Sequence, residues 1–480
     1  MKAKRNGFWN IRRHAGLIYV AVIGLMAILF ACTDNVFNDG DEEDDNNVPS
    51  VTEPYWILAI GGDGRDYAPS FSVTDDGYVV VGMTTSYGLG DGGNNLDGSH
   101  DFLAVKLDKK GNHVWSRTIG GAQDERGSFS ASPTSDGGFL LTGTTSSFGS
   151  GKADLLVVKL DSSGHLVWCR AIGSKEQETG KTTLEVEDGY IALGDTNSVG
   201  AGKRDLLVVK LDTDGNLAWA KAIGGTGDDK GSGIEEVSGG YVIGGTIWSF
   251  GAGGADACLI KTDKWGNVIW SKTIGGSRDE GINWDGVRVT TDGGYALGEG
   301  TTSYGASEQA VCGIKLSSDC ILEWAIMVDG RQEDAGWTMS ETNDGYIAGG
   351  KYTIPNNGGD VVFLKLDRSG NFLWARTFGD TGLDEIEEIK QADNGYVMAG
   401  VTRMMESDGD FLVAKVNADG YVGGNSDPIT ALSPMSVVAV TPQVIPFTPK
   451  QTDASSLIKA VSVSPTVTTP TLQIHVIHRN

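Results

Sequence analysis

The stretch Asp154–Gly173, DLLVVKLDSSGHLVWCRAIG, decides the fold of this chain. Its first part is apolar at consecutive positions from Leu155 to Val158, as in a strand that is buried on both faces. A tight turn follows at Asp161–Gly164, because Asp bonds back to nearby amides and Gly accepts a positive φ. Trp168 lies in the return strand. The stretch therefore predicts a β-hairpin.

This hairpin recurs along the chain. Its tryptophan has seven equivalents, separated by 50 to 59 residues, and its upstream lysine also has seven. An aromatic residue that follows a two-residue turn is a third marker with seven copies. Three markers thus agree on seven units. They are Trp56, Trp115, Trp168, Trp219, Trp270, Trp324 and Trp374; Lys106, Lys159, Lys210, Lys261, Lys315, Lys365 and Lys415; and Tyr78, Phe139, Tyr190, Tyr241, Tyr295, Tyr346 and Tyr396.

Each unit contains four predicted strands, which we name A to D: a polar strand, the aromatic strand, the lysine strand and the tryptophan strand. The A-to-B turns, such as Asp76-Gly77 and Gly137-Gly138, have the residues of type I′ hairpins. Four short strands repeated seven times predict an all-β fold, a seven-bladed β-propeller of four-stranded blades. A linear β-solenoid is the rival, but its coils are usually far shorter.

The two ends of the repeat region are complementary. It begins with a lone tryptophan strand, Tyr55–Ile60, and its last unit stops after the lysine strand, Asp410–Asn417. We therefore expect the N-terminal strand to complete the last blade and close the ring within residues 52–424. Residues 425–480 hold seven of the twelve prolines, and we expect an extended or loosely docked tail. A small partner-binding or export module is the alternative for this tail.

Residues 1–31 have the features of a secretory leader. Five basic residues precede the apolar run Gly16–Ala31, which is shorter than the roughly 20 residues of a spanning helix. The end, Leu29-Phe30-Ala31-Cys32, resembles a bacterial lipoprotein signal, which implies cleavage before Cys32 and its acylation. Residues 32–51 are then an acidic flexible tether. We expect attachment to the bacterial envelope, at the outer membrane or cell surface rather than the inner membrane; an ordinary signal peptide or uncleaved anchor is the alternative.

Composition narrows the range of partners. The formal net charge is −25, and only 38 residues are Lys or Arg, so no basic stripe predicts a nucleic-acid partner. We expect a monomer.

Cys312 and Cys320 share a hairpin, but its register does not place them opposite each other, so we expect unpaired thiols. The sequence has no Gly-x-Ser-x-Gly, CxxC or HExxH motif.

The repeat resembles that of bacterial β-propeller-repeat envelope proteins, which are related in style to quinoprotein-like propellers. The likeness lies in DLLVVKLDSSGHLVW (154–168), TSDGGFLLTGTTSSFG (134–149) and the AIGG..DD pattern, as in residues 222–229, and covers about three quarters of the chain. It implies the propeller fold, while most such proteins have no assigned activity. Quinoprotein dehydrogenases would imply a bound quinone and calcium, but no residue here matches their cofactor sites.

The D-to-A loops carry carboxylates in every unit. Strand order places these loops with the B-to-C loops on one face, around a mouth of the channel, because strand A is innermost. Hard cations such as Ca²⁺ favour clustered oxygen ligands, so a metal site is one interpretation. Repetition around the ring favours the other, that each carboxylate caps amides of its own or a neighbouring loop. The metal candidates are Asp124, Glu125, Asp228, Asp229, Asp279, Glu280, Asp384 and Glu385.

Two other sets of residues bear on stability and binding. We expect each repeated lysine to pair with a polar residue of the A-to-B turn, at Asp75, Asp136, Glu187, Ser238, Asp292, Asn343 or Asp393. Trp284 and Trp337 fall in the A strands of adjacent blades and are candidate ligand-binding residues for a sugar or peptide; packing between blades is the alternative. Blade 1 has a long B-to-C loop, Gly88–Asp101, whose spacing does not match an EF-hand.

Together these features predict a lipid-anchored, non-enzymatic propeller that binds an envelope protein or a glycan through its acidic loop face. One alternative is a carbohydrate-active enzyme that uses the channel-mouth carboxylates, since paired carboxylates serve glycoside hydrolysis. The other is a purely structural surface module.

Overall fold

The computed structural model describes residues 54–87, 99–304, 306, 309–329, 335–354, 358–379, 382–403, 409–423 and 428–431, with tail segments 436–439, 443–446, 450–453, 459–462, 466–468 and 473–479. The leader, Cys32, the tether and most of the loop Gly88–Asp101 lie outside these residues. The chain divides into Met1–Thr52 and Glu53–Asn480, and the fold described below is that of the second unit. In the described part of the chain, no helix is long and apolar enough to cross a membrane.

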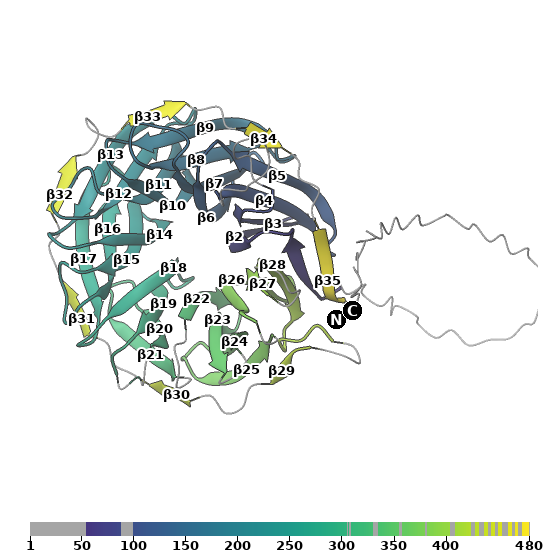
Figure 1. Cartoon of the computed structure of the whole chain (residues 1–480). Helices are drawn as coiled ribbons and strands as arrows, with labels where there is room; N and C mark the ends of the chain where they lie inside the picture. The colour runs from purple at the N-terminus through teal and green to yellow at the C-terminus, as the bar shows by residue number, and fades with distance from the viewer. Residues whose placement is uncertain are drawn as a thin grey trace, which may run out of the picture. The chain divides into compact units, whose positions relative to one another are not determined.

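Seven antiparallel sheets stand around a central channel, so the predicted β-propeller of four-stranded blades is confirmed (Figure 1). Strand A is innermost in each blade and strand D lies outside it. Blades 1 to 3 consist of β2 (Asp66–Thr74), β3 (Gly77–Thr84), β4 (Asp101–Asp108), β5 (His113–Gly120); β6 (Glu125–Pro133), β7 (Phe139–Thr145), β8 (Asp154–Leu160), β9 (Leu166–Gly173); and β10 (Glu178–Val186), β11 (Gly189–Thr196), β12 (Asp205–Leu211), β13 (Leu217–Gly224). Blades 4 to 7 consist of β14 (Lys230–Val237), β15 (Gly240–Ile247), β16 (Asp256–Asp263), β17 (Val268–Gly275); β18 (Glu280–Val289), β19 (Tyr295–Thr301), β20 (Ala310–Leu316), β21 (Leu322–Asp329); β22 (Ala335–Thr342), β23 (Gly345–Ile354), β24 (Gly358–Asp367), β25 (Phe372–Phe378); and β26 (Glu385–Ala392), β27 (Gly395–Thr402), β28 (Asp410–Asn417) with β1 (Trp56–Gly61).

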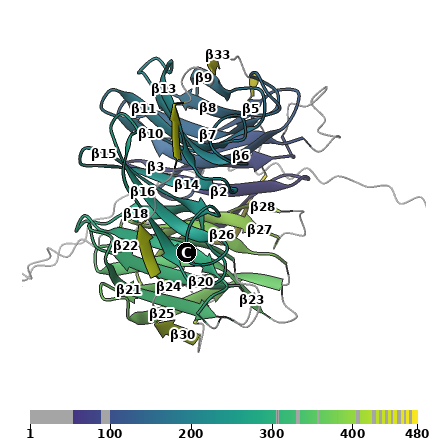
Figure 2. The same ribbon diagram turned by 90° about the vertical axis from the view of Figure 1, so that its left-hand side faces the viewer.

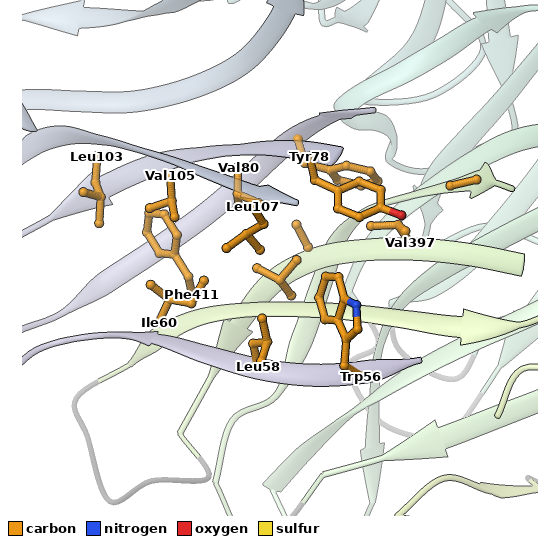
Figure 3. Close-up of a cluster of buried hydrophobic side chains, with 14 residues drawn as sticks. Trp56, Leu58, Ile60, Tyr78, Val80, Leu103, Val105, Leu107, Val397 and Phe411 are labelled. Carbon is orange, nitrogen blue, oxygen red and sulfur yellow. The ribbon is translucent and has the colours of Figure 1, made fainter. Parts of the chain in front are cut away.

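The ring closes as the sequence predicts. The N-terminal strand β1 pairs antiparallel with β28, in a register that sets Ile60 opposite Phe411 and Trp56 opposite Lys415. Side chains of β1 then pack with those of blade 1, so one apolar cluster joins the last blade to the first (Figure 3). Trp56, Leu58 and Ile60 are fully buried in it. Burial of such side chains contributes about 1.5–3 kcal/mol each.

The repeated tryptophan holds neighbouring blades together. Trp56 of blade 7 meets Tyr78 of blade 1 edge-on, with ring centroids 5.9 Å apart. The indole also covers Gly111 in the C-to-D turn of blade 1, where an added Cβ would come within 2.8 Å of the ring. That glycine has φ +76°, so the turn and the contact both require it. The same contact between blades occurs at Trp115–Gly164, Trp168–Gly215, Trp219–Gly266, Trp324–Gly370 and Trp374–Gly420.

The C-terminal tail adds a fifth strand to the outside of every blade, a role that the repeat pattern did not indicate. The chain passes around the ring in the order opposite to the blades and ends on β1 (Figures 1 and 2). Its strands are β29 (Thr430–Ala431) on blade 6, β30 (Ser436–Ala439) on blade 5, β31 (Gln443–Pro446) on blade 4, β32 (Lys450–Asp453) on blade 3, β33 (Lys459–Ser462) on blade 2, β34 (Thr466–Thr468) on blade 1 and β35 (Gln473–Arg479) on blade 7.

This belt covers the edges that ring closure leaves. Closing a propeller joins its blades, but the outer edge of each strand D still presents unpaired backbone groups. The belt strands pair antiparallel with these edges, as where Lys450–Asp453 faces Lys221–Gly224. The longest, β35, pairs along the whole of β1 from Trp56 to Gly61, the strand that closes the ring. The belt therefore reinforces the closure.

We predict that a chain ending at Gly423 is less stable and self-associates. Removing β29–β35 exposes seven outer edges, and unpaired edges invite pairing between chains. Thermal unfolding should move to lower temperature, and light scattering should show association that rises with concentration. A chain lacking residues 33–51, which keeps every described strand, is the control. A truncated chain that stays monomeric with an unchanged unfolding midpoint would contradict a stabilising belt.

Candidate functional site

The D-to-A and B-to-C loops meet on one face of the ring, as expected. The amide of Ser146 in a B-to-C loop donates to the carbonyl of Asp124 in a D-to-A loop at 2.7 Å. The A-to-B and C-to-D turns meet on the other face, where Lys109 pairs with Asp393 of the neighbouring blade at 3.4 Å. We call the first face the mouth face and the second the turn face. Most breaks in the repeat that bear on binding lie on the mouth face.

Most of the carboxylates that begin the A strands are structural caps. Glu125 is fully buried and accepts hydrogen bonds from the Gly121 amide and the Thr145 hydroxyl, both at 2.7 Å. Asp229 likewise binds the Gly225 amide at 2.7 Å and the Trp248 amide at 2.9 Å. These bonds tie the D-to-A loop to the B-to-C loop of the same blade. Asp66, Glu178, Glu280 and Asp384 occupy equivalent positions and accept equivalent bonds.

The preceding acidic residues join one blade to the next. Asp124 accepts the His100 amide at 2.9 Å, and Asp279 accepts the Ala255 amide at 2.9 Å. Asp228 pairs with Arg204 at 3.1 Å. In blade 7 the cap is Asp384, so Glu385 is not the equivalent of Glu125 but lies one position further along strand A.

The oxygen atoms of the metal candidates are thus largely committed to protein donors. In the parts of the chain that the structure describes, no three His, Cys, Asp or Glu side chains gather closely enough to hold a metal ion. The four described cysteines, Cys169, Cys258, Cys312 and Cys320, are buried thiols without disulfides.

A second set of buried aspartates begins the C strands. Asp256 is fully buried and accepts weak hydrogen bonds from the amides of Ala252 and Gly253, both at 3.3 Å. Across Gly275 it approaches Glu280, the cap of blade 5; an added Cβ on that glycine would come within 2.8 Å of both carboxylates. Burial raises the pKa of Asp256 to about 6. The two hydrogen bonds oppose this rise, and repulsion by Glu280 adds to it. Burial raises the pKa of Asp66 to about 6 in the same way.

The Asp256–Glu280 pair gives the stability of the fold an unusual dependence on pH. Because the pKa of Asp256 is higher in the folded chain than its ordinary 3.8, its contribution to stability is present below pH 4 and is lost as pH rises through about 6. We predict that the free energy of unfolding falls over this window, by on the order of 2 kcal/mol for this group. Asp256→Asn, which mimics the neutral acid, should flatten the fall in chemical unfolding curves, whereas the exposed Asp214→Asn should not. Parallel curves for all three chains would refute the assignment.

On the turn face, the expected lysine–carboxylate pairs form in six blades. The lysines are buried, and the aspartates lie in the A-to-B turns. The expected partners Asp75, Glu187 and Asn343 are wrong by one residue. In Asp-Gly turns the aspartate within the turn is the partner, whereas in Gly-Gly turns it is the aspartate before them. The pairs are Lys106–Asp76 at 2.5 Å, Lys159–Asp136 at 2.9 Å, Lys210–Asp188 at 2.8 Å, Lys315–Asp292 at 2.9 Å, Lys365–Asp344 at 2.8 Å and Lys415–Asp393 at 3.1 Å.

An ion cluster joins A strands of blades that are not all neighbours. Arg288 in β18 pairs with Glu235 in β14 at 3.1 Å and with Glu388 in β26 at 2.8 Å. The second pair joins blade 5 to blade 7, so it spans the channel past blade 6. Glu388 is 1 % exposed, pairs with Lys390 at 2.5 Å and accepts the Ser70 hydroxyl at 2.9 Å. The cluster therefore links the A strands of blades 4, 5 and 7 at the centre of the ring.

We predict that Arg288→Met costs about 2–3 kcal/mol of unfolding free energy, because it leaves two carboxylates of the cluster without their shared cation. Lys109→Met is the matched control. It removes a lysine whose pair with Asp393 is exposed, and such pairs contribute less than about 1 kcal/mol. Denaturant unfolding of both variants measures the difference. Equal losses would mean that the channel cluster contributes no more than a surface pair.

Blades 3 to 5 form a pocket of about 490 Å³ at the mouth face. Lys230 and Ser232 begin the same strand that carries Glu235 deeper in the channel, and Glu280 to Ile282 begin the strand that carries Arg288. Lys181 and Arg204 of blade 3 complete one wall. The lining is Lys181, Arg204, Lys230, Gly231, Ser232, Thr246, Trp248, Ala255, Asp279, Glu280, Gly281, Ile282, Gly300, Thr301, Thr302 and Gln309.

The structure describes the backbone, but not the side chains, of the two tryptophans predicted from the sequence. Trp284 lies in β18, two residues beyond Ile282 of the pocket, and Trp337 lies in β22. Both fall where the register between strands A and B is irregular. Their side chains are outside the described part of the structure. Their proposed role in ligand binding stays a prediction.

The tryptophan that does line the pocket, Trp248, was missed by sequence reasoning. It is 41 % exposed, and the Lys230 ammonium lies 4.8 Å from its ring centroid. The two tryptophans predicted from the sequence lie in A strands, whereas Trp248 lies in a B-to-C loop. The equivalent residues in blades 2, 3 and 5 are Ser146, Asn197 and Thr302. Aligning those loops across the seven units would have revealed it.

Comparisons with known proteins found distant likenesses. No family model matches the chain. The regulatory protein FlaEY of Caulobacter vibrioides is 24% identical over 311 residues, covering 58% of this chain and 31% of that protein. The chain thus matches about a third of the length of that relative. The structure of a subtype N11 neuraminidase-like protein of A/flat-faced bat/Peru/033/2010 (H18N11) has a TM-score of 0.37 and 11% identity, covering 76% of this chain and 97% of that one. Such a distant likeness carries no conclusion about activity.

Proposed function

We propose that this protein is a non-enzymatic binding module of the bacterial envelope. In this proposal the acylated Cys32 tethers it, and the mouth pocket takes a ligand that belongs to an envelope protein or a glycan. The observation that carries the proposal is the pocket itself, a hollow of about 490 Å³ whose lining includes residues that break the sevenfold repeat, such as Lys181, Arg204 and Trp248. Its volume falls in the usual range for ligand sites, which are few per protein and partly apolar.

The case against catalysis rests on what the carboxylates already do. Glu280, which lines the pocket, accepts the Gly276 amide at 2.5 Å and the Thr301 hydroxyl at 2.9 Å. A catalytic acid or base must reach the proton that it transfers, and this carboxylate holds the loops together instead. Asp279 faces the pocket as a single rim carboxylate. We therefore favour binding over hydrolysis.

Two exposed tryptophans provide a matched test. Trp248 lies on the mouth face and Trp265 on the turn face, and each has a lysine ammonium near its ring, at 4.8 Å and 4.9 Å from the centroid. We predict that Trp248→Ala abolishes binding or weakens it by about thirtyfold, since an aromatic anchor in a pocket contributes on the order of 2 kcal/mol. Trp265→Ala should leave binding within about twofold. Glycan arrays and photo-crosslinking of the full chain in intact cells are the measurements.

Other results would redirect the proposal. Binding that survives Trp248→Ala but not Trp265→Ala would move the site to the turn face. Turnover of any bound glycan would reject a non-enzymatic role. Failure of the wild-type chain to bind any glycan or envelope protein would favour a structural module.

A further inference from the structure

One wall of the mouth pocket is basic, although the chain as a whole carries a formal charge of −25. Lys181 comes from β10, Lys230 from β14, and Arg204 immediately precedes β12. Lys181 and Arg204 are departures from the repeat, whereas at the position of Lys230 blade 2 also has a cation, Arg126. Where Lys181 stands, blade 4 has Ser232, and where Arg204 stands, blade 4 has Ala255. The fold does not need positive charge at these positions, so the wall calls for another explanation.

Two carboxylates, Asp228 and Asp195, stand near these three cations. Asp228 serves two cations, with Arg204 at 3.1 Å and Lys230 at 3.8 Å. The charge of Asp195 acts on Lys181, and Asp195 is fully buried. Its oxygens accept hydrogen bonds from a backbone amide at 2.7 Å and from a hydroxyl at 3.1 Å. Burial raises the pKa of Asp195. Burial lowers the pKa of Lys181. The charge of Asp195 raises this pKa, whereas the charges of Arg204 and Lys230 lower it. The wall therefore has an excess of positive charge.

The rest of the pocket is suited to hydroxyl groups. Asp279 holds the Ala255 amide through Oδ1, and its Oδ2 accepts no hydrogen bond within the described residues. Thr302 and Gln309 stand beside it as further polar groups. Trp248 supplies one aromatic face at the rim. Ala255 and Ile282 are the aliphatic side chains of the lining, so the pocket offers little to an apolar peptide side chain.

We propose that the mouth pocket binds an acidic saccharide, a sugar unit with one carboxylate and several hydroxyls. Its carboxylate would meet Arg204, Lys181 and Lys230, its ring would lie against Trp248, and its hydroxyls would bond to Asp279 on the opposite wall. Hydrogen bonds between such cations and a carboxylate are among the strong ones in proteins. This inference rests on the proposed function, because it uses the same pocket, and it names the class of ligand.

The charge of the protein favours a saccharide over an acidic peptide. A peptide with several carboxylates would place its further charges against an acidic surface, whereas a single charge fits within the basic wall. The Debye length of about 8 Å at physiological salt confines the favourable field to the pocket. An acidic peptide is therefore an alternative outcome of the test rather than part of the proposal.

The test is calorimetric titration of the full chain with a trisaccharide that carries a single galacturonate unit and with the same trisaccharide after carboxyl reduction. The acidic form should bind at least about tenfold more tightly, and raising the salt concentration should weaken its binding. Arg204→Gln should weaken it by about tenfold or more. Lys203→Gln removes the same charge one residue away, from an exposed side chain outside the pocket, and should change binding less than twofold.

Three results would overturn the proposal in distinguishable ways. Equal binding of the acidic and reduced trisaccharides, or equal effects of Arg204→Gln and Lys203→Gln, would reject recognition of the carboxylate by this wall. Binding of a tetra-aspartate peptide but of neither trisaccharide would reject the saccharide and leave the binding module intact. Absence of any ligand for the mouth face, in this titration and in the array, would remove both proposals.

Discussion

The contact of each repeated tryptophan with the next blade is the constraint on which this structure depends. A four-stranded blade has two apolar faces and cannot stand alone in water. In six places the indole of strand D covers the C-to-D glycine of the following blade, as Trp324 covers Gly370 while it also meets the strand-B aromatic Tyr346; blade 5 has Cys320 at the glycine position. A side chain on that glycine would collide with the indole. The spacing of tryptophan, aromatic and glycine along the chain therefore specifies how each blade packs against the next.

Closure uses this same contact rather than a special device. Trp56 belongs to the last blade by hydrogen bonding and to the first by packing, so the first strand of the domain has two reasons to end where it does. The polar contacts also recur around the ring. Carboxylate caps hold the loops on the mouth face, and buried lysines hold the turns on the other face. Because these groups recur around the ring, they are explained by the fold and give little information about a ligand.

Much of the fold could be predicted from the sequence, because its signals are local and repeated sevenfold. The blade count and the closing strand followed from Trp56 and the missing strand after Asn417, and both are confirmed. Three of the lysine partners, Asp136, Asp292 and Asp393, were predicted correctly. Three others were predicted with a slip of one residue, since an Asp-Gly turn and an Asp-Gly-Gly turn place the aspartate differently. The belt could not be predicted. Its strands have two to seven residues and no periodicity, and β35 pairs with a strand some 400 residues earlier.

The pocket could not be predicted for a different reason: it depends on side chains from three blades that depart from the repeat. Blade 5, which borders it, departs most. Ala310 begins its strand C where six blades have aspartate, and Glu299 stands where the other B strands have glycine. Burial, with Glu280 nearby, raises the pKa of Glu299 well above its ordinary value, so the blade keeps an acidic group at this level by another route. Trp270 still meets Tyr295 at 6.1 Å, and the contact between blades is intact. A propeller can lose symmetry at its mouth while the tryptophan contacts preserve the ring, which is why irregularities there indicate function more directly than the repeated residues do.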